Sequence, residues 1–344
     1  MRKLLWVTAS AFVLAVVSII LFAAYIHRYM HKPIDLNEAA YFVIEPGVGL
    51  RQVSDRLHTL GIISEPEFFH WYSRLRGKAT AIRAGEYEVS VGSTPAELLE
   101  RLVAGDVVLH SLTVVEGWTF RQMQQQVASH PAITSTDKGA STGAIMEALG
   151  AENVHPEGQF FPDTYRFTRG TTDVDIYRQA YRLMQTKLAE AWAQRDEGLS
   201  LSGPYQALIL ASIIEKESAL GSERKIISGV FSRRLRRGMR LQTDPTVIYG
   251  LGPDFNGNIT RRDLTTDTPY NTYTRSGLPP TPIALPGMGS LEAAVQPEAG
   301  EALYFVATGL DDGSHYFSAT LEEHNRAVQR YLETLRKRRQ NNEG

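Results

Sequence analysis

The 344-residue sequence contains no cysteine, which excludes disulfide bonds, thiolate zinc sites and a cysteine nucleophile. Its 36 basic and 38 acidic residues leave a net charge of −2, so composition gives no reason to expect nucleic acid as a partner. The patterns G-x-S-x-G and H-E-x-x-H and the phosphate loop are missing, and His315 and His324 are too far apart to indicate a metal site. We therefore expect no cofactor and no metal. A hydrophobic content of 43% still supports packed cores.

Charged residues are also absent from Leu4 to Ile26, a run of 23 residues. A helix needs about 20 apolar residues to cross a bilayer core, so this run predicts a membrane span. Arg2 and Lys3 favour a cytoplasmic N-terminus, although two basic residues beyond the run weaken that asymmetry. A cleaved signal peptide is the alternative, but the run is long for one and bulky Phe22 stands close to the best cleavage position. We expect an uncleaved anchor that leaves the remainder of the chain on the other side.

A strand–turn–helix unit repeats three times after the apolar run. The copies align on Gly47, Gly92 and Gly117, each of which follows a strand-like stretch and precedes apolar residues at positions +6 and +10. In two copies Thr94 or Thr119 stands where a helix N-cap is expected. Spacing alone leaves two interpretations open, a glycan-binding module and a plain packing unit.

The segment from Tyr205 to Leu220 has no internal proline or glycine and predicts a nearly all-apolar, buried helix. At about 100° per residue, Glu217 points along the apolar stripe and Glu215 points nearly opposite. A carboxylate on a buried face is costly unless it is paired or protonated. Two interpretations are open for Glu217. It forms a buried ion pair with the basic helix that follows, or it is a general acid with the raised pKa that glycoside cleavage requires.

Helical periodicity ends near Gly238, and the sequence between Gln242 and Ser290 predicts long polar loops. Loops of this length inside a domain are more often functional than accidental. Aromatic faces stack on sugar rings, amides bond hydroxyl groups, and prolines stiffen a groove wall. The candidates for sugar binding in this segment are Gln242, Asp244, Tyr249, Tyr270, Asn271 and Tyr273. Each of them taken alone is more often structural than a ligand contact.

Five motifs in order, EGQFFPDTY, ASIIEKES, LQTDPTVIYG, YNTY and GLPPTPI, resemble the endolytic murein transglycosylases, also called the MltG or YceG-like family. The pattern PGVGLRQVSDRL resembles the opening of a LysM module. The resemblance implies a periplasmic lyase that cuts the MurNAc–GlcNAc bond within peptidoglycan strands and leaves 1,6-anhydro ends. It also implies a lysozyme-like helix with Glu217 as the catalytic residue, followed by Ser218, which joins the sugar-binding candidates.

Together these observations predict an α+β chain in five parts. They are a cytoplasmic tail at 1–3, an inner-membrane anchor at 4–26, a polar tether at 27–40, a LysM-like subdomain at 41–110 and a mixed α/β catalytic domain at 111–344. The expected partners are peptidoglycan strands and the inner membrane, with peptidoglycan synthases as further candidates. Two rival functions stay open: a muramidase with Asp244 as its second carboxylate, and a non-catalytic glycan-binding scaffold.

Overall fold

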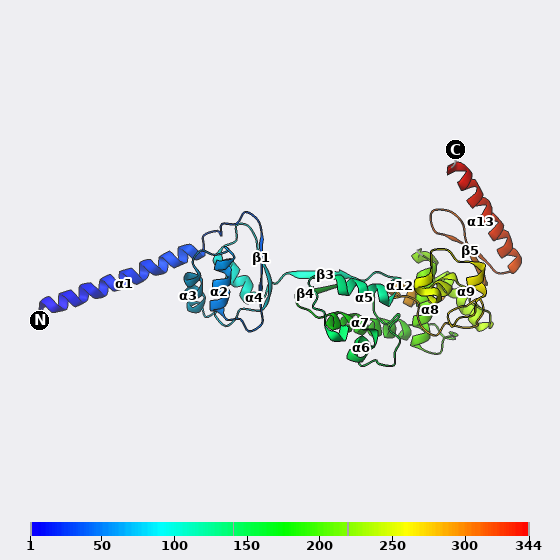
Figure 1. Ribbon diagram of the computed structural model, residues 1–344, viewed down its shortest axis with the longest axis horizontal. Coiled ribbons are helices and arrows are strands. Elements are labelled where there is room, and N and C mark those ends of the chain that lie inside the picture. The colour runs from blue at the N-terminus through cyan, green and yellow to red at the C-terminus, as the bar shows by residue number, and fades with distance from the viewer. Residues whose placement is uncertain (1, 140, 219, 343–344) are drawn as a thin grey trace. The chain divides into compact units, whose positions relative to one another are not determined.

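The computed structural model describes residues 2–139, 141–218 and 220–342. The chain forms two compact units (Figure 1). Unit 1 comprises Met1–His110 and Arg166–Gly170, and unit 2 comprises Ser111–Tyr165 and Thr171–Gly344. The division falls within a two-stranded ribbon of β3 (Leu109–Thr113) and β4 (Thr164–Thr168).

Unit 1 begins with a long helix, α1 (Arg2–Met30). Its segment Trp6–Met30 is long and apolar enough to cross a membrane, judged by length and composition. The large side chains along this segment, from Trp6 to Tyr25, are exposed in the protein. An apolar helix that packs against nothing for most of its length is typical of a membrane segment rather than of a core helix.

The C-terminal end of α1 is built into unit 1. Ile26 and Met30 are one helical turn apart and, together with Ile34, are buried in the unit 1 core. The prediction of a polar tether at residues 27–40 is wrong in this respect. α1 continues four residues past the uncharged run to Met30, and Ile34 follows in the non-helical segment after it.

Two copies of the predicted repeat make up most of unit 1. They are β1 (Ala40–Ile44) followed by α2 (Leu50–Thr59), and β2 (Gly85–Val89) followed by α4 (Pro95–Ala104), with α3 (Pro66–Leu75) after the first copy. β1 and β2 pair antiparallel, with Phe42 opposite Tyr87. Gly47 and Gly92 have φ angles of 83° and 85°, a region that favours glycine. The apolar residues at +6 and +10 are buried in both copies, which confirms the predicted repeat: Val53, Leu57, Leu98 and Leu102.

The third copy opens unit 2. β3 leads through Gly117, with φ 78°, into α5 (Phe120–Ser129), whose Met123 and Val127 are buried. Thr119 caps α5 by accepting a hydrogen bond from the Gln122 N–H, as predicted. The connection that follows contains α6 (Thr142–Ala148) and leads through β4 to α7 (Asp173–Ala193).

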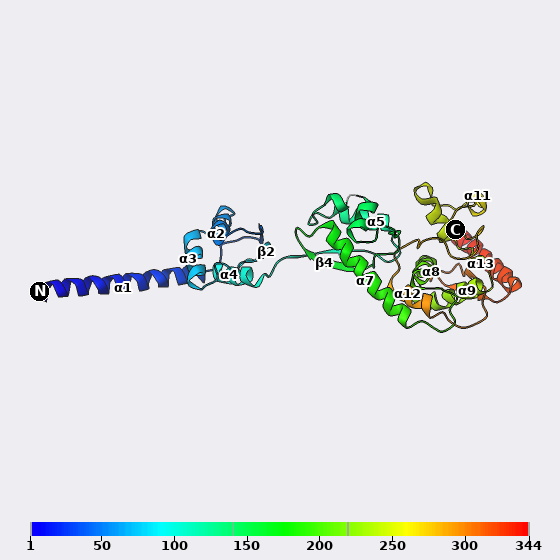
Figure 2. The ribbon, with the colours of Figure 1, turned by 90° about the horizontal axis from the view of Figure 1, so that it is seen from below.

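A buried helix, α8 (Pro204–Glu217), lies at the centre of unit 2. Every residue from Ala207 to Ile214 is buried, as the apolar sequence predicts. α7, α9 (Arg224–Arg236) and α12 (Met288–Val295) pack around α8 (Figure 2). Because α8 is covered on all sides until its last turn, the side chains at its C-terminal end have fixed positions.

The segment after α9 is more helical than predicted. Its first part is α10 (Asp244–Leu251), and α11 (Arg261–Thr265) follows. A proline in the first turn favours the start of a helix, and Pro245 occupies that position in α10. Unit 2 ends with the hairpin of β5 (Tyr304–Ala307) and β6 (His315–Ser318) and with α13 (Leu321–Asn342). The chain is therefore a mixed α and β protein with an apolar N-terminal helix.

Candidate active site

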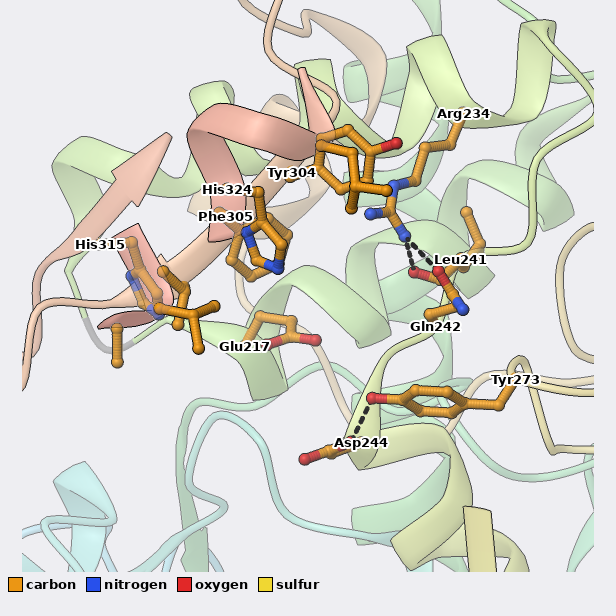
Figure 3. A pocket seen from close by; sticks show the side chains of 14 residues that line it. Glu217, Arg234, Leu241, Gln242, Asp244, Tyr273, Tyr304, Phe305, His315 and His324 are labelled. Carbon is orange, nitrogen blue, oxygen red and sulfur yellow. Dashed lines mark hydrogen bonds between the residues drawn. The ribbon is translucent and has the colours of Figure 1, made fainter. Parts of the chain in front are cut away.

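The C-terminal end of α8 lines a cavity of about 560 Å³ in unit 2 (Figure 3). Figure 3 shows Glu217 in the middle of the surrounding side chains. The polar part of the wall consists of Glu217, Arg234, Gln242, Asp244 and Tyr273. The β5–β6 hairpin and α13 supply the remainder, which includes Tyr304, Phe305, His315, Leu321 and His324. The cavity has the size of a small-molecule or sugar site and combines apolar surface with a few polar groups.

Glu217 is the last residue of α8, and Ser218 leaves the helical conformation with φ −132° and ψ 127°. The Thr243 hydroxyl donates a hydrogen bond to Glu217 Oε1. Burial raises the pKa of Glu217 to about 7, and the negative charge of Asp244 acts in the same direction. The Thr243 hydrogen bond and the electrostatic effects of His315 and Arg234 oppose this rise. A carboxyl group with this pKa can both give and take a proton near neutral pH.

The buried ion pair that the sequence allowed belongs to Glu215 instead. Its carboxylate accepts hydrogen bonds from Arg224 Nη2 at 2.9 Å and from the Gly287 N–H at 2.9 Å, and its side chain is 5% exposed. In the described part of the chain Glu217 forms no ion pair. The helical phase correctly separated the two carboxylates, but the face of Glu215 is covered by α9 and by the segment before α12 rather than by water.

Asp244 and Tyr273 form a second polar group in the cavity. The Tyr273 hydroxyl donates to Asp244 Oδ1 at 2.5 Å, and both side chains lie near Glu217 in Figure 3. Burial and the bond to Asp244 raise the pKa of Tyr273, so its hydroxyl keeps its proton at neutral pH. Asp244 is the first residue of α10, where the helix dipole favours a negative charge. Asp244 is therefore a hydrogen-bond acceptor close to Glu217.

Gln242 has φ 52° and is the only non-glycine residue with a positive φ among the described residues. The Arg234 guanidinium supports this strained position, because it donates to the carbonyl oxygen of Leu241 at 2.8 Å and to Gln242 Oε1 at 3.4 Å. Arg234 also donates to the Leu303 carbonyl oxygen at 2.6 Å. Arg234 has only hydrogen-bond donors, so the Gln242 side-chain amide must turn its oxygen toward the guanidinium. Figure 3 shows the amide nitrogen of Gln242 directed away from Arg234. The Gln242 amide nitrogen is therefore not a partner of Arg234, and Gln242 lines the cavity.

His315 and His324 complete the wall opposite Gln242. His315 Nδ1 lies 2.6 Å from Glu223 Oε2, and the His315 backbone N–H donates to Glu223 Oε1 at 3.0 Å. The His324 ring stacks on Tyr304 with centroids 5.3 Å apart, and burial lowers the pKa of His324. The described residues contain no group of three or more His, Asp or Glu side chains that could hold a metal.

The YceG-like family model matches residues 42–330 of the chain. The chain belongs to the YceG-like family.

Two relatives of this YceG-like chain are named endolytic murein transglycosylase. The chain is 30% identical over 306 residues to the endolytic murein transglycosylase of Bacillus subtilis strain 168, a match that covers 84% of each chain. It is 27% identical over 336 residues to the endolytic murein transglycosylase of Streptococcus pneumoniae strain D39, covering 87% of this chain and 60% of that relative. Among solved structures, a putative YceG-like protein from Listeria monocytogenes matches with a TM-score of 0.52 and 30% identity, covering 84% of this chain and 99% of the other.

Three of the sugar-binding candidates predicted for this YceG-like chain lie in the cavity with Glu217: Gln242, Asp244 and Tyr273. The other four are not in its wall, and their side chains bond within the protein, so sugar binding by them stays a prediction. Ser218 Oγ accepts from the Leu220 N–H at 3.0 Å. The Asn271 amide donates to three backbone carbonyl groups of the α11 segment.

Tyr249 and Tyr270 pack edge to face with ring centroids 4.9 Å apart, and each hydroxyl bonds elsewhere. The Tyr249 hydroxyl donates to Glu157 Oε2 at 3.1 Å, and the Tyr270 hydroxyl lies 2.9 Å from Thr281 Oγ1. They join the EGQFFPDTY and YNTY motifs of the YceG-like chain to its core.

Sequence reasoning missed four groups of side chains in this YceG-like site. Arg234 was considered only as an ion-pair partner, and Thr243 was not singled out. Tyr304 and Phe305 carry no sequence signal for sugar binding, and the two histidines were considered only as metal ligands. Thr320 and Glu323 form a helix cap beside His324, since the Glu323 N–H donates to Thr320 Oγ1 and the Thr320 N–H to Glu323 Oε2, and His324 lines the cavity. The positive φ of Gln242 is likewise invisible in the sequence.

Proposed function

We propose that this chain is a lytic transglycosylase that cleaves the MurNAc–GlcNAc bond within peptidoglycan strands. The names of the Bacillus and Streptococcus relatives support the substrate and the reaction class. The observation that carries the proposal is Glu217, an unpaired carboxyl group with a pKa of about 7 in the wall of a cavity large enough for a sugar. Such a group is the acid that glycoside cleavage requires at neutral pH.

The reaction proceeds with one carboxyl group. Thr243 occupies Oε1 of Glu217, which leaves Oε2 to carry the transferable proton. Glu217 donates this proton to the glycosidic oxygen, and the bond between that oxygen and C1 of MurNAc breaks. The resulting carboxylate takes the proton of the C6 hydroxyl, and the C6 oxygen closes onto C1. The product is a 1,6-anhydro ring, and no water enters the reaction.

The other side chains of the cavity hold the sugar. The Gln242 amide donates a hydrogen bond to an oxygen of the sugar, and Asp244 accepts one from a hydroxyl group. Tyr304 and Phe305 supply apolar surface of the kind that packs on sugar rings. Fixed contacts of this kind hold the ring in a reactive geometry, which contributes to the rate through orientation.

A two-carboxylate hydrolase is the nearest rival, with Asp244 as the second carboxylate. A hydrolase needs either a free nucleophile or a base that activates water between the two groups. Asp244 already accepts a hydrogen bond from the Tyr273 hydroxyl at 2.5 Å, which occupies one of its two oxygens. This contact favours the one-carboxylate reaction.

Digestion of purified glycan strands, followed by mass spectrometry of the fragments, separates the candidates. We expect internal cleavage with 1,6-anhydro ends. Reducing ends with incorporated ¹⁸O from labelled water would instead indicate a muramidase. Binding of strands without any fragments would indicate a non-catalytic scaffold and would overturn the proposal.

We also propose that α1 anchors the chain in the inner membrane, with unit 2 in the periplasm. One apolar helix of sufficient length supports this topology. The LysM-like assignment of residues 41–110 stays a prediction: the strand–turn–helix copies have the expected local structure, and glycan binding by them is untested. Recruitment of peptidoglycan synthases likewise stays a prediction.

A further inference from the structure

α3 carries apolar side chains on two faces. Phe69 and Ser73 on one face are buried in the unit 1 core. On another face, Phe68, Trp71 and Leu75 recur at spacings of three and four, so they form one line along the helix. We call these three residues the α3 stripe. Trp71 is 53% exposed and Leu75 is 78% exposed, so most of this line is uncovered in the protein.

The α3 stripe starts against the apolar part of α1. The ring of Phe68 packs edge to face on Phe22, Tyr25 and Tyr29, with centroids 6.0, 5.6 and 5.6 Å away. Phe22 lies inside the uncharged run and precedes its last residue, Ile26, by four positions, which is about 6 Å along a helix axis. If that run fills the hydrocarbon core, Phe68 lies at the depth where the core meets the lipid headgroups.

α1 and α3 are joined firmly enough to fix this depth. Met30 is fully buried in the unit 1 core, so the span does not end in a free linker. The Tyr29 hydroxyl accepts a hydrogen bond from the Glu65 N–H at 3.0 Å, immediately before α3 begins. In both views α3 lies at the end of unit 1 from which α1 departs (Figures 1 and 2). Unit 1 therefore presents α3 toward the membrane if α1 crosses it.

Aromatic and basic residues of the kinds found at membrane interfaces surround the C-terminal part of the α3 stripe, whereas the exposed Glu65 and Glu67 lie at its start, where Glu67 pairs with Arg51. Trp and Tyr rings are favoured at headgroup level, and basic side chains reach lipid phosphates. Arg28 and Lys32 are exposed at the end of α1, and Arg74 and Arg76 are exposed on α3. The Arg76 guanidinium lies over the Tyr72 ring at 5.2 Å, which keeps a cation beside the apolar line.

We propose that α3 is a second membrane contact, in which the α3 stripe inserts into the headgroup layer of the leaflet where α1 emerges. This inference rests on the proposed anchoring by α1 and goes beyond it, because an anchor alone does not require unit 1 to touch the lipid surface. The depth set by the Phe68–Phe22 contact identifies the bilayer, rather than a second protein, as the covering partner. Two contacts instead of one restrict the tilt of unit 1 on the membrane.

Because the native chain contains no cysteine, single cysteines can be labelled with an environment-sensitive nitrobenzoxadiazole dye in the full chain. The test positions are Trp71→Cys and, as a second substitution on the same stripe, Leu75→Cys. Val91→Cys is the matched control, since Val91 is 59% exposed in the same unit, and Val13→Cys marks the span. The labelled chains are reconstituted into vesicles of phosphatidylethanolamine and phosphatidylglycerol, with doxyl-labelled lipids as membrane quenchers and iodide as the aqueous quencher.

We expect the dye at position 71 to be blue-shifted and quenched by lipid with a shallow doxyl group, while the dye at 91 is quenched by iodide alone. The dye at position 13 should be quenched by deep doxyl groups. If position 13 is not quenched, the anchoring itself is wrong. If position 13 is quenched but 71 and 75 behave like 91, the anchor stands and the α3 contact is wrong. Shielding of 71 from both quenchers would mean that protein covers the stripe, which also overturns the inference.

Discussion

At the scale of single residues, Glu217 decides whether the chain cleaves glycan strands. Glu217→Gln keeps the shape of the side chain and removes the transferable proton. We expect strand cleavage to fall by at least about 10²-fold, the lower range for general acid–base catalysis, while glycan binding is retained. Release of anhydro-ended fragments measures the loss. Because the raised pKa shows that burial disfavours the charged form, the melting temperature at pH 8 should stay the same or rise.

Glu215→Gln is the matched control on the same helix. It removes the nearer of two carboxylates from the Arg224 guanidinium and leaves Glu116 at 3.6 Å, so the loss of stability stays below the roughly 3–5 kcal/mol of a buried charge left unpaired. We therefore expect the Glu215→Gln protein to have a lower melting temperature than the native protein. Its folded form should still cleave glycan strands much faster than the Glu217→Gln protein. A folded Glu217→Gln protein that releases anhydro ends at a near-native rate would remove Glu217 from the active site.

Arg234 is expected to act through Gln242. Arg234→Lys keeps the charge but cannot donate to several acceptors in the same fork, so the strained backbone at Gln242 should relax. We expect kcat/KM to fall about tenfold or more, since a hydrogen bond to a charged group contributes about 1.5–3 kcal/mol. In a protein that already carries Gln242→Ala, adding Arg234→Lys should lower kcat/KM little further. Fully additive losses in this double-mutant cycle would argue against the coupling.

At the scale of elements, Glu157 joins α5 to α10. Its carboxyl group accepts hydrogen bonds from the Phe120 N–H at 2.9 Å and from the Tyr249 hydroxyl at 3.1 Å. Burial raises its pKa to about 7 from an ordinary value of 4.5, and these two hydrogen bonds oppose the rise. In the folded protein the group is therefore protonated at pH values where the unfolded chain has already released the proton.

This raised pKa predicts a pH dependence of stability. The contribution of Glu157 to the free energy of unfolding is fully present below pH 4.5 and is lost as the pH rises to about 7, at about 1.4 kcal/mol per pH unit. Glu157→Gln does not titrate and keeps a hydrogen-bonding group at both positions. We expect urea unfolding at several pH values to show the Gln protein gaining stability relative to the native protein between pH 5 and pH 7. A difference independent of pH would contradict the buried, protonated state.

The elements themselves were mostly predictable from the sequence. The three glycine turns and the apolar positions that follow them gave the strand–turn–helix copies, and the uninterrupted apolar segment gave α8. The prediction failed where a local cue competed with composition. Polar loops were expected after Gly238, but Pro245 in a first helical turn starts α10. Within the predicted tether, Met30 and Ile34 are buried in the unit 1 core.

At the scale of the whole molecule, we expect a membrane topology with one N-terminal span. A C-terminal alkaline phosphatase fusion should be active, because the enzyme works only after export, and the mature chain should keep its first residues. Both results follow from a single uncleaved span at about residues 4–26. A fusion active only as a cytoplasmic reporter, or a mature N-terminus after residue 20, would show that the topology is wrong.

The sequence by itself determined the local features of this protein: the apolar span, the repeated turns, the buried helix and the separation of Glu215 from Glu217 by helical phase. These features depend on residues within one or two turns of each other, so periodicity records them. Only the tertiary structure brought Arg234, Gln242 and the β5–β6 hairpin to Glu217, assigned the ion pair to Glu215, and placed α3 against the span. These contacts join segments far apart in the chain, and no local pattern specifies which distant side chains will meet.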